Sequence, residues 1–256
     1  MAGCASRKSG DGPPSSGSSV PGQLPPDAVP RKEPRSRYGN PPVYKVYGVR
    51  YSVKESSYGY KERGVASWYG KKFHGRKTSS QEPYDMYAMT AAHKTLPLPT
   101  YVRVRNLRNN KSIVVRVNDR GPFVDNRIID LSYSAAIKLD MITSGTALVE
   151  VTALSYDDPP PTTVRDMPTR TVKSAPQAEN DVYVQVGAFG DIANAKRRFA
   201  LLRDSGIDGA FVHKDENRSP ALYRIRIGPV RGVNDYDELV NKLARIGVTE
   251  SHLVTN

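Results

Sequence analysis

The chain has 256 residues, a length that favours two domains over one. Its formal net charge of +12 comes mainly from the first part of the chain, since residues 1–63 carry 11 Lys and Arg against 5 Asp and Glu and residues 64–155 carry 13 against 7; such a surface attracts polyanions or simply keeps the protein soluble. The sequence has no apolar run long enough to span a bilayer, and its single cysteine excludes an internal disulfide framework.

Residues 1–42 predict a disordered tether. Nine of the 20 prolines fall here, among runs of Ser and Gly, and this composition does not build a packed element. Cys4 stands in Ala2-Gly3-Cys4-Ala5, which resembles the end of a bacterial lipobox, where a signal peptide is cut before a lipid-modified cysteine. The resemblance implies lipidation of Cys4, a membrane anchor through that lipid, and sorting to the outer membrane because Ala follows the cysteine.

Residues 43–155 predict a β-rich domain, of which 43–63 form an ordered lead-in. Asn109 and Asn110 suit a hairpin turn between two strand-like segments. Ser132 is typical of the N-cap of a short helix. We expect strands over 101–105, 113–117 and 147–151.

Five further prolines in residues 156–180 predict a semi-rigid linker. The rest of the chain, 181–256, repeats itself with a period of 41 residues, which places Gly187 on Gly228. Each half has the pattern strand, helix, strand, so we expect a βαββαβ domain with both helices on one face of a four-stranded sheet.

Period-two alternation predicts which side chains point away from those helices: Tyr183, Gln185, Arg224 and Arg226. They form either a binding surface or an ordinary solvated sheet face. RNA recognition modules share the βαββαβ layout, but here the third strand carries a single aromatic residue, and 181–256 hold 11 basic against 10 acidic residues. We therefore expect no nucleic acid partner.

The block from Gly64 to Leu131 places ionisable residues beside Gly and Pro, as in loops over a rigid scaffold. It resembles the catalytic barrel of the rare lipoprotein A family, and the C-terminal part resembles the sporulation-related repeat (SPOR) domain. These resemblances imply a mainly β, six-stranded double-psi β-barrel followed by an α+β, ferredoxin-like SPOR domain. The motifs that carry them are Gly64-Val-Ala-Ser-Trp-Tyr-Gly70, Phe73-His-Gly-Arg-Lys-Thr78, Glu82-Pro-Tyr-Asp-Met86, Thr90-Ala-Ala-His-Lys-Thr-Leu-Pro-Leu98, Val117-Asn-Asp-Arg-Gly-Pro-Phe123, Ile129-Asp-Leu131, Val184-Gln-Val-Gly-Ala-Phe189 and Tyr223-Arg-Ile-Arg-Ile-Gly-Pro229.

Three residues match functional positions of the family. Asp119 is the candidate general acid and base, although an Asp here could also close an Asx turn or pair with Arg120. Glu82 could position the substrate, stabilise positive charge or exchange roles with Asp119. His93 could hydrogen-bond a carboxylate or a sugar hydroxyl, or could be a satisfied structural histidine.

Further candidates are weaker. Asp85 could contact substrate, with a structural turn as its default role. Trp68, Tyr69 and Tyr84 could stack on sugar faces or belong to the core. The family commonly has Gly before the active-site Glu, whereas Gln81 stands here and would resist a positive φ.

Other classes of site lack their signatures. The chain has no paired metal-ligand spacing, no Gly-x-Ser-x-Gly elbow and no phosphate-cradling Gly loop, so we expect neither metal nor cofactor.

The resemblance implies a lytic transglycosylase that cuts the MurNAc–GlcNAc β-1,4 bond of peptidoglycan lacking stem peptides and leaves 1,6-anhydro-MurNAc ends. It also implies a periplasm-facing outer-membrane lipoprotein at the division septum, where other divisome or cell-wall proteins are potential partners. Two alternatives stay open. The chain could be a septal glycan-binding scaffold without activity, or an inverting hydrolase with Glu82 roughly 6.5–9.5 Å from the acid.

Overall fold

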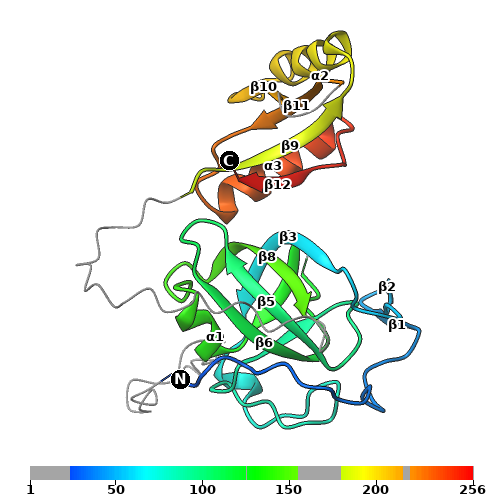
Figure 1. Cartoon of the computed structure of the whole chain (residues 1–256), viewed down its shortest axis with the longest axis vertical. Coiled ribbons are helices and arrows are strands. Elements are labelled where there is room, and N and C mark those ends of the chain that lie inside the picture. The colour runs from blue at the N-terminus through cyan, green and yellow to red at the C-terminus, as the bar shows by residue number, and fades with distance from the viewer. Residues whose placement is uncertain (1–23, 125, 155–179, 216–219, 256) are drawn as a thin grey trace, which may run out of the picture.

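The computed structural model describes residues 24–124, 126–154, 180–215 and 220–255. Figure 1 shows two folded parts, a β-barrel and a smaller C-terminal domain of sheet and helices. The predicted lipidation site Cys4 and nearly all of the predicted linker lie outside the described residues. Within the described residues, no helix combines the length and apolar character needed to cross a bilayer.

The first domain is a closed barrel of six strands in the order β3-β7-β4-β6-β5-β8. Most neighbours are antiparallel, but β3 pairs with β7, and β4 with β6, in parallel. This agrees with the six-stranded barrel expected from sequence. The strands are β3 (Lys61–Trp68), β4 (Thr90–His93), β5 (Thr100–Asn106), β6 (Ser112–Asp119), β7 (Arg127–Leu131) and β8 (Thr146–Leu154).

Local sequence explains the barrel's turns. The β5–β6 hairpin closes through Asn110, whose φ of 58° is one that asparagine tolerates better than most residues. Ser132 caps the short helix α1 (Tyr133–Lys138), as predicted, and its side chain accepts a hydrogen bond from the amide of Ala135.

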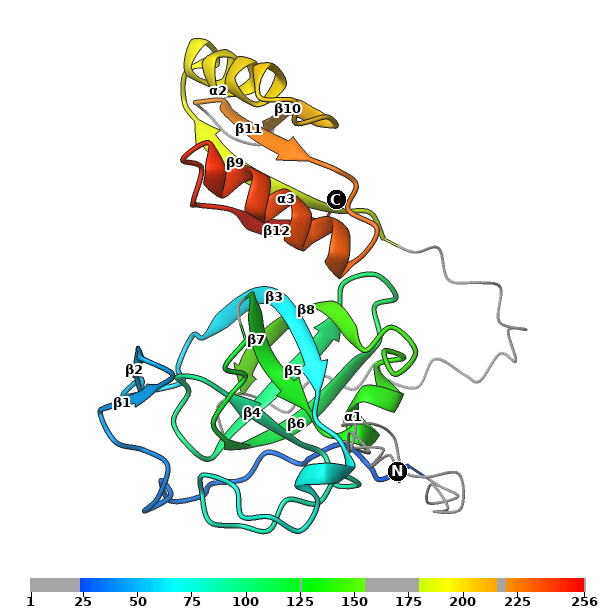
Figure 2. The same ribbon diagram turned by 180° about the vertical axis from the view of Figure 1, so that it is seen from behind.

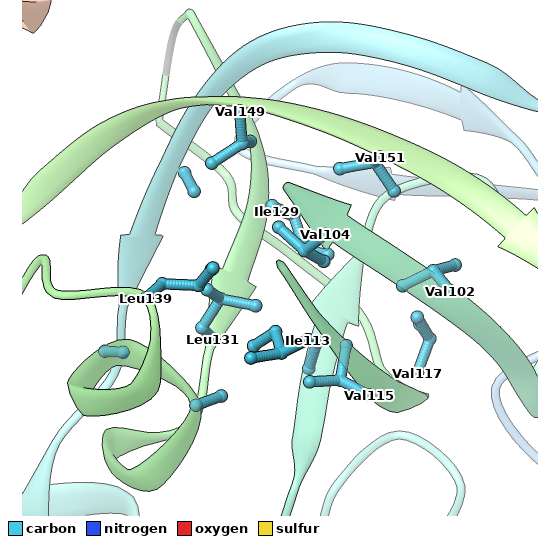
Figure 3. Packing of buried hydrophobic residues seen from close by; sticks show 14 of the residues in the cluster. Val102, Val104, Ile113, Val115, Val117, Ile129, Leu131, Leu139, Val149 and Val151 are labelled. Atoms are coloured by element: carbon cyan, nitrogen blue, oxygen red, sulfur yellow. The ribbon is translucent and has the colours of Figure 1, made fainter. Parts of the chain in front are cut away.

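Apolar side chains from all six strands fill the barrel interior. Figure 3 shows them converging from β5, β6, β7 and β8, with Leu139 after α1 closing one side. Most are fully buried because alternate strand residues point inward, which leaves the intervening positions for the outer face. The labelled core residues are Val102, Val104, Ile113, Val115, Val117, Ile129, Leu131, Leu139, Val149 and Val151.

The predicted lead-in forms a hairpin of β1 (Val43–Val46) and β2 (Val49–Ser52). Tyr44 stacks on Tyr51 at 5.3 Å, and both rings contact Phe123 after β6. A single 3₁₀ turn, η1 (Lys71–Phe73), follows β3.

The sequence predicted a disordered tether over the whole of 1–42, but residues 24–42 are bound to the barrel. We call these residues the N-terminal strap. The strap runs along the barrel in extended form (Figure 2). It also makes specific hydrogen bonds to the barrel. Ala28 donates to the carbonyl of Val114 at 3.0 Å, and Asn40 pairs with both backbone groups of Leu98 at 2.8 Å. Its prolines fit this role because an extended segment without regular ladder partners needs few of its own N–H groups.

The C-terminal domain has the predicted βαββαβ order and a four-stranded sheet in the order β10-β11-β9-β12. Inward valines and isoleucines of β9 and β11 share one buried cluster with both helices, as the alternation predicts. Its elements are β9 (Val182–Phe189), α2 (Ile192–Asp204), β10 (Ala210–Asp215), β11 (Leu222–Ile227), α3 (Val233–Arg245) and β12 (His252–Thr255).

The two domains contact each other directly. Val65, Leu107 and Leu148 of the barrel belong to the same buried cluster as the C-terminal core. The Arg63 guanidinium donates to the carbonyl of Leu253 at 3.1 Å. The linker composition gave no sign of this packing, because the contacts come from residues far from the linker in sequence.

Candidate functional site

Asp119 ends β6 on the outer face of the barrel. The β4–β6 register shifts by one residue there, so that Ala91 pairs with Val117 but Ala92 pairs with Asp119. A bulge of this kind redirects side chains at the end of a strand. As a result Asn118 and Asp119 both contact the loop before β4, while Val117 stays in the core.

One oxygen of Asp119 is fully engaged. Oδ1 accepts three hydrogen bonds of 2.7 Å, from the amide and hydroxyl of Ser79 and from the amide of Arg120. None of the described residues donates to Oδ2. The carboxyl group is therefore fixed in orientation, with one oxygen left to exchange a proton or to bind a ligand.

Glu82 lies on the loop that crosses this face. Arg116 donates two hydrogen bonds of 2.7 and 3.0 Å to its carboxylate, and Asn118 donates a third at 2.9 Å. Partial burial favours the neutral form, but the bonds from Arg116 and Asn118 outweigh it and lower the pKa of Glu82. Glu82 is consequently an anion at neutral pH, next to the residue that precedes Asp119.

The loop geometry at Glu82 depends on the residue before it. Gln81 adopts a φ of 71°, the left-handed region that a Gly would enter without strain. The structure therefore contains the backbone strain expected from sequence, a residue with a Cβ held at a positive φ. Two backbone hydrogen bonds hold Gln81 in this conformation. The amide of Gln81 donates to the carbonyl of Thr78, and the amide of Thr78 donates to the carbonyl of Glu82.

Asp130 is a third carboxylate on this face, and sequence reasoning missed it. Ala92 pairs with Asp119 on one side and with Asp130 of β7 on the other. Neighbouring strands lie about 4.8 Å apart, so the two aspartate Cα atoms are separated by roughly 10 Å. Ser67 donates its hydroxyl to Asp130. The alternation in Ile129-Asp130-Leu131 could have marked it as outward-facing, but its neighbours depend on strand order, which the sequence does not reveal.

The hydroxyl of Tyr69 is buried near these two aspartates, whose charges both act on it. Burial raises the pKa of its hydroxyl well above the ordinary value, and the charges of Tyr84, Asp119 and Asp130 raise it further. Its ring stacks on Tyr84 at 4.1 Å, and both side chains are buried, with exposures of 8% and 3%. In this conformation the two predicted stacking residues are packed against each other under the site.

The other predicted contacts are more exposed. Trp68 is half-buried and packs on Tyr133 at 5.6 Å. Asp85 accepts a hydrogen bond from the amide of Tyr87 at 2.9 Å, which is the turn role that was its default.

His93 is buried, and among the described residues its ring nitrogens bond Tyr60, Thr95 and Leu96 rather than Asp119. Its Nδ1 accepts hydrogen bonds from the amides of Thr95 and Leu96 at 3.2 and 3.0 Å, so its proton resides on Nε2, which donates to the hydroxyl of Tyr60 at 2.8 Å. Tyr60 in turn donates to Glu62, which lines a groove of about 650 Å³ between the two domains.

Burial, with smaller contributions from Arg120 and nearby lysines, lowers the pKa of His93 to about 3. His93 still acts on the site indirectly. The turn that it fixes presents the carbonyls of His93 and Leu96 to the guanidinium of Arg120, at 3.1 and 2.5 Å. Arg120 directly follows Asp119, so the histidine helps to hold the strand end that carries the carboxylate.

On the C-terminal domain, the strand registers align one residue from each strand across the uncovered sheet face. They place Phe211 beside Arg226, Arg226 beside Gln185, and Gln185 beside His252. Gln185 is only 9% exposed within this row. Phe211 and His252 were not predicted, because only the pairing of β10 and β12 reveals them.

The remaining predicted residues flank that row. Tyr183 packs edge-to-face on Phe211 at 5.5 Å. Arg224 forms an ion pair with Asp215 at 3.0 Å. The face therefore combines aromatic, amide and cationic groups, the kinds of groups that bind sugars and carboxylates.

Comparison with known proteins divides the chain in the same way. A family model described as lytic transglycolase matches residues 61–151, and one described as SPOR domain matches residues 178–252. Among solved structures, the Streptomyces papain inhibitor aligns with a TM-score of 0.32 and 24% identity over 38% of this chain and 96% of its own.

Curated relatives match between half and four-fifths of the chain. A protein of Pseudomonas aeruginosa named endolytic peptidoglycan transglycosylase RlpA is 38% identical over 82% of this chain and 74% of its own length. Proteins of the same name from Vibrio cholerae and Neisseria meningitidis are 56% and 49% identical over 52% and 64% of this chain. The chain spans half the length of the Vibrio relative. It belongs to the rare lipoprotein A family, whose curated members carry the name RlpA.

Proposed function

We propose that this protein is an endolytic lytic transglycosylase that cuts MurNAc–GlcNAc β-1,4 bonds in peptidoglycan. The observation that carries the proposal is the pair of differently held carboxylates on the outer face of the barrel. Asp119 has one oxygen fixed by three donors and the other without a described donor, whereas Glu82 is held as an anion by Arg116. One acid and one stabilising anion are what glycosidic cleavage requires.

In the proposed reaction, the Asp119 carboxyl protonates the departing glycosidic oxygen as the bond to the anomeric carbon breaks. The anionic Glu82 stabilises the positive charge that develops on the sugar ring. The C6 hydroxyl of the same muramic acid residue then attacks the anomeric carbon and gives its proton to Asp119. The product is a 1,6-anhydro end, no water is consumed, and Asp119 returns to its acid form.

Two further residues have proposed roles. Asp130 adds negative charge on the opposite side of Ala92 from Asp119 and would stabilise the same oxocarbenium-like centre. His93 is a positioning residue, since it reaches the site only through the turn that holds Arg120.

The C-terminal domain is the proposed glycan-binding module, and the supporting observation is the cross-strand row on its uncovered sheet face. The proposed ligand is glycan without stem peptides, which would concentrate the protein at the division septum. An outer-membrane anchor on Cys4, with the protein facing the periplasm, belongs to the same proposal. Joining two glycan-binding units in one chain raises the effective concentration of substrate at the barrel.

Mass spectrometry of glycan strands freed of stem peptides tests the activity. The full chain is expected to produce new 1,6-anhydro-muramyl ends, and Asp119→Asn is expected to lose at least about 100-fold of this activity. Asp140→Asn serves as the matched control, because Asp140 is an exposed carboxylate paired only with Lys111 among the described residues.

Three products separate the alternatives. New reducing ends instead of anhydro ends would indicate a hydrolase, and strands that bind but stay intact would indicate a scaffold. Equal activity in Asp119→Asn and Asp140→Asn would remove Asp119 from the chemistry.

A further inference from the structure

The N-terminal strap reaches both arginines that hold the candidate carboxylates. Glu33 bonds Arg116 through two contacts, at 3.1 Å to Nε and 2.7 Å to Nη2. The carbonyl of Gly39 and the side chain of Asn40 accept from Arg120 at 2.8 and 3.1 Å. The strap lies N-terminal to the residues 61–151 that match the lytic transglycolase family model.

Arg116 is shared between the strap and the site. Two of its guanidinium nitrogens contact Glu82 and two contact Glu33, with Nη2 common to both. Its side chain is only 17% exposed, as is that of Glu33. A buried cation between two carboxylates is held on both sides, so its orientation toward Glu82 depends on the partner behind it.

We propose that Glu33 is a positioning residue of the barrel site, which fixes Arg116 in the orientation that holds Glu82. The strap is then a working part of the catalytic domain rather than a tether. This inference rests on the proposed function, because it assigns Glu33 a role in the same reaction.

Further contacts fix the Glu33 carboxylate in position. Tyr101 donates its hydroxyl to Glu33, and Arg31 contacts the same carboxylate at 3.1 Å. The hydrogen bonds from Arg116 are the main cause that lowers the pKa of Glu33 to about 2, so it is ionised wherever the protein is folded near neutral pH. Its negative charge in turn raises the pKa of Glu82, against the lowering by Arg116 and Asn118.

The substitution Glu33→Gln in the full chain tests the proposal. It keeps the shape of the side chain but removes the charge behind Arg116. We expect kcat for anhydro-end formation to fall between about 10-fold and 100-fold, since small misplacements of catalytic groups have effects of this size. We also expect the acid limb of the pH–rate profile to move to higher pH. An Arg116 that is no longer held from behind lowers the pKa of Glu82 less, and this loss outweighs the smaller effect of removing the Glu33 charge.

Asp27→Asn is the matched control. Asp27 anchors the strap by accepting from the amide of Val114 at 2.8 Å and from Lys138 at 2.5 Å, and it touches neither Arg116 nor Arg120. Loosening the strap in this way should leave the acid limb where it is. Thermal unfolding of both variants shows whether each is folded at the assay temperature.

A second readout separates this inference from the proposed reaction. Carboxyl-carbon NMR follows the titration of Glu82 directly, without substrate. If the wild type makes no anhydro ends but Glu33→Gln raises the Glu82 titration midpoint, the proposed reaction is wrong and the positioning role of Glu33 stands. If the wild type is active, and Glu33→Gln leaves kcat, the acid limb and the Glu82 midpoint all unchanged, Glu33 has no positioning role.

Discussion

The outer face of the barrel and the uncovered face of the C-terminal sheet carry similar polar groups in very different settings. On the barrel, each candidate carboxylate is fixed by partners from distant segments, such as Ser79 on Asp119 and Arg116 on Glu82. On the C-terminal sheet, strand pairing sets out the row, with Arg226 between Phe211 and Gln185, and the Arg224–Asp215 ion pair joins two neighbouring strands of the same sheet.

This difference matches two physical tasks. Chemistry requires a few groups held within a fraction of an ångström, so each needs its own hydrogen-bonded support. Binding a repetitive polymer requires a row of groups that tolerates sliding, and the register of a pleated sheet sets out such a row. Substitutions should therefore act sharply on the barrel and gradually on the C-terminal face.

The largest expected effect sharpens the barrel side of this comparison. Asp130→Asn removes a carboxylate across Ala92 from Asp119 but keeps an oxygen that accepts from Ser67. We expect activity on stripped glycan strands to fall on the order of 100-fold, as for the loss of one electrostatic stabiliser, with little change in thermal stability. Asp140→Asn controls for a carboxylate outside the site, and equal activity of the two variants would exclude Asp130 from it.

His93 tests the support beneath the barrel site. His93→Phe keeps an aromatic ring but leaves the amides of Thr95 and Leu96 without their buried acceptor, so we expect a loss of about 2 kcal/mol in the free energy of unfolding. Urea unfolding measures it. An effect on activity without any loss of stability would instead indicate direct contact with substrate.

The same residue gives a pH prediction with a definite sign. The folded-state pKa of His93 is about 3 against an ordinary 6.5, so between these values the unfolded chain binds more protons. The free energy of unfolding should therefore fall as pH drops from about 6.5 toward about 3, and His93→Phe should flatten that slope. An NMR titration of the His93 ring with a midpoint near 6.5 would contradict the buried, neutral state.

These two regions also differ in how much the sequence could predict. Alternation and the 41-residue repeat predicted the C-terminal fold and assigned Tyr183, Gln185, Arg224 and Arg226 to one face, because both patterns can be recognised in the sequence without knowing the strand order. The barrel was predicted by family resemblance. The hydrogen bonds that hold its carboxylates were not predicted, because they join distant parts of the sequence. Glu33 and Arg116, for example, are 83 residues apart.

A moderate effect is expected on the C-terminal face. Arg226→Ala removes the central cation of the cross-strand row, and we expect the affinity for stripped glycan strands to fall by roughly 10-fold, which corresponds to one substantial contact. Arg203→Ala is the control, since Arg203 is an exposed cation on α2. A loss of 1000-fold would contradict the gradual behaviour that the row implies, and equal binding by both variants would exclude the face as the glycan site.

The smallest effect concerns the loop beneath Glu82. Gln81 holds a φ of 71°, which costs a residue with a Cβ roughly 1 kcal/mol. Gln81→Gly removes that strain but loses more chain entropy on folding, so we expect a net stabilisation below about 1 kcal/mol by urea unfolding. Gln81→Ala keeps the Cβ and should give no gain, which separates strain from the loss of an exposed side chain.

Activity of the same variant tests what positions Glu82. If Arg116 and Asn118 hold the carboxylate, as the three hydrogen bonds indicate, a more flexible residue 81 should change kcat less than about 2-fold. A larger loss would mean that the strained backbone itself sets the position of Glu82. The position of the barrel carboxylates would then depend on local backbone geometry as much as on hydrogen bonds from distant residues. In that respect the barrel face would resemble the C-terminal sheet more closely.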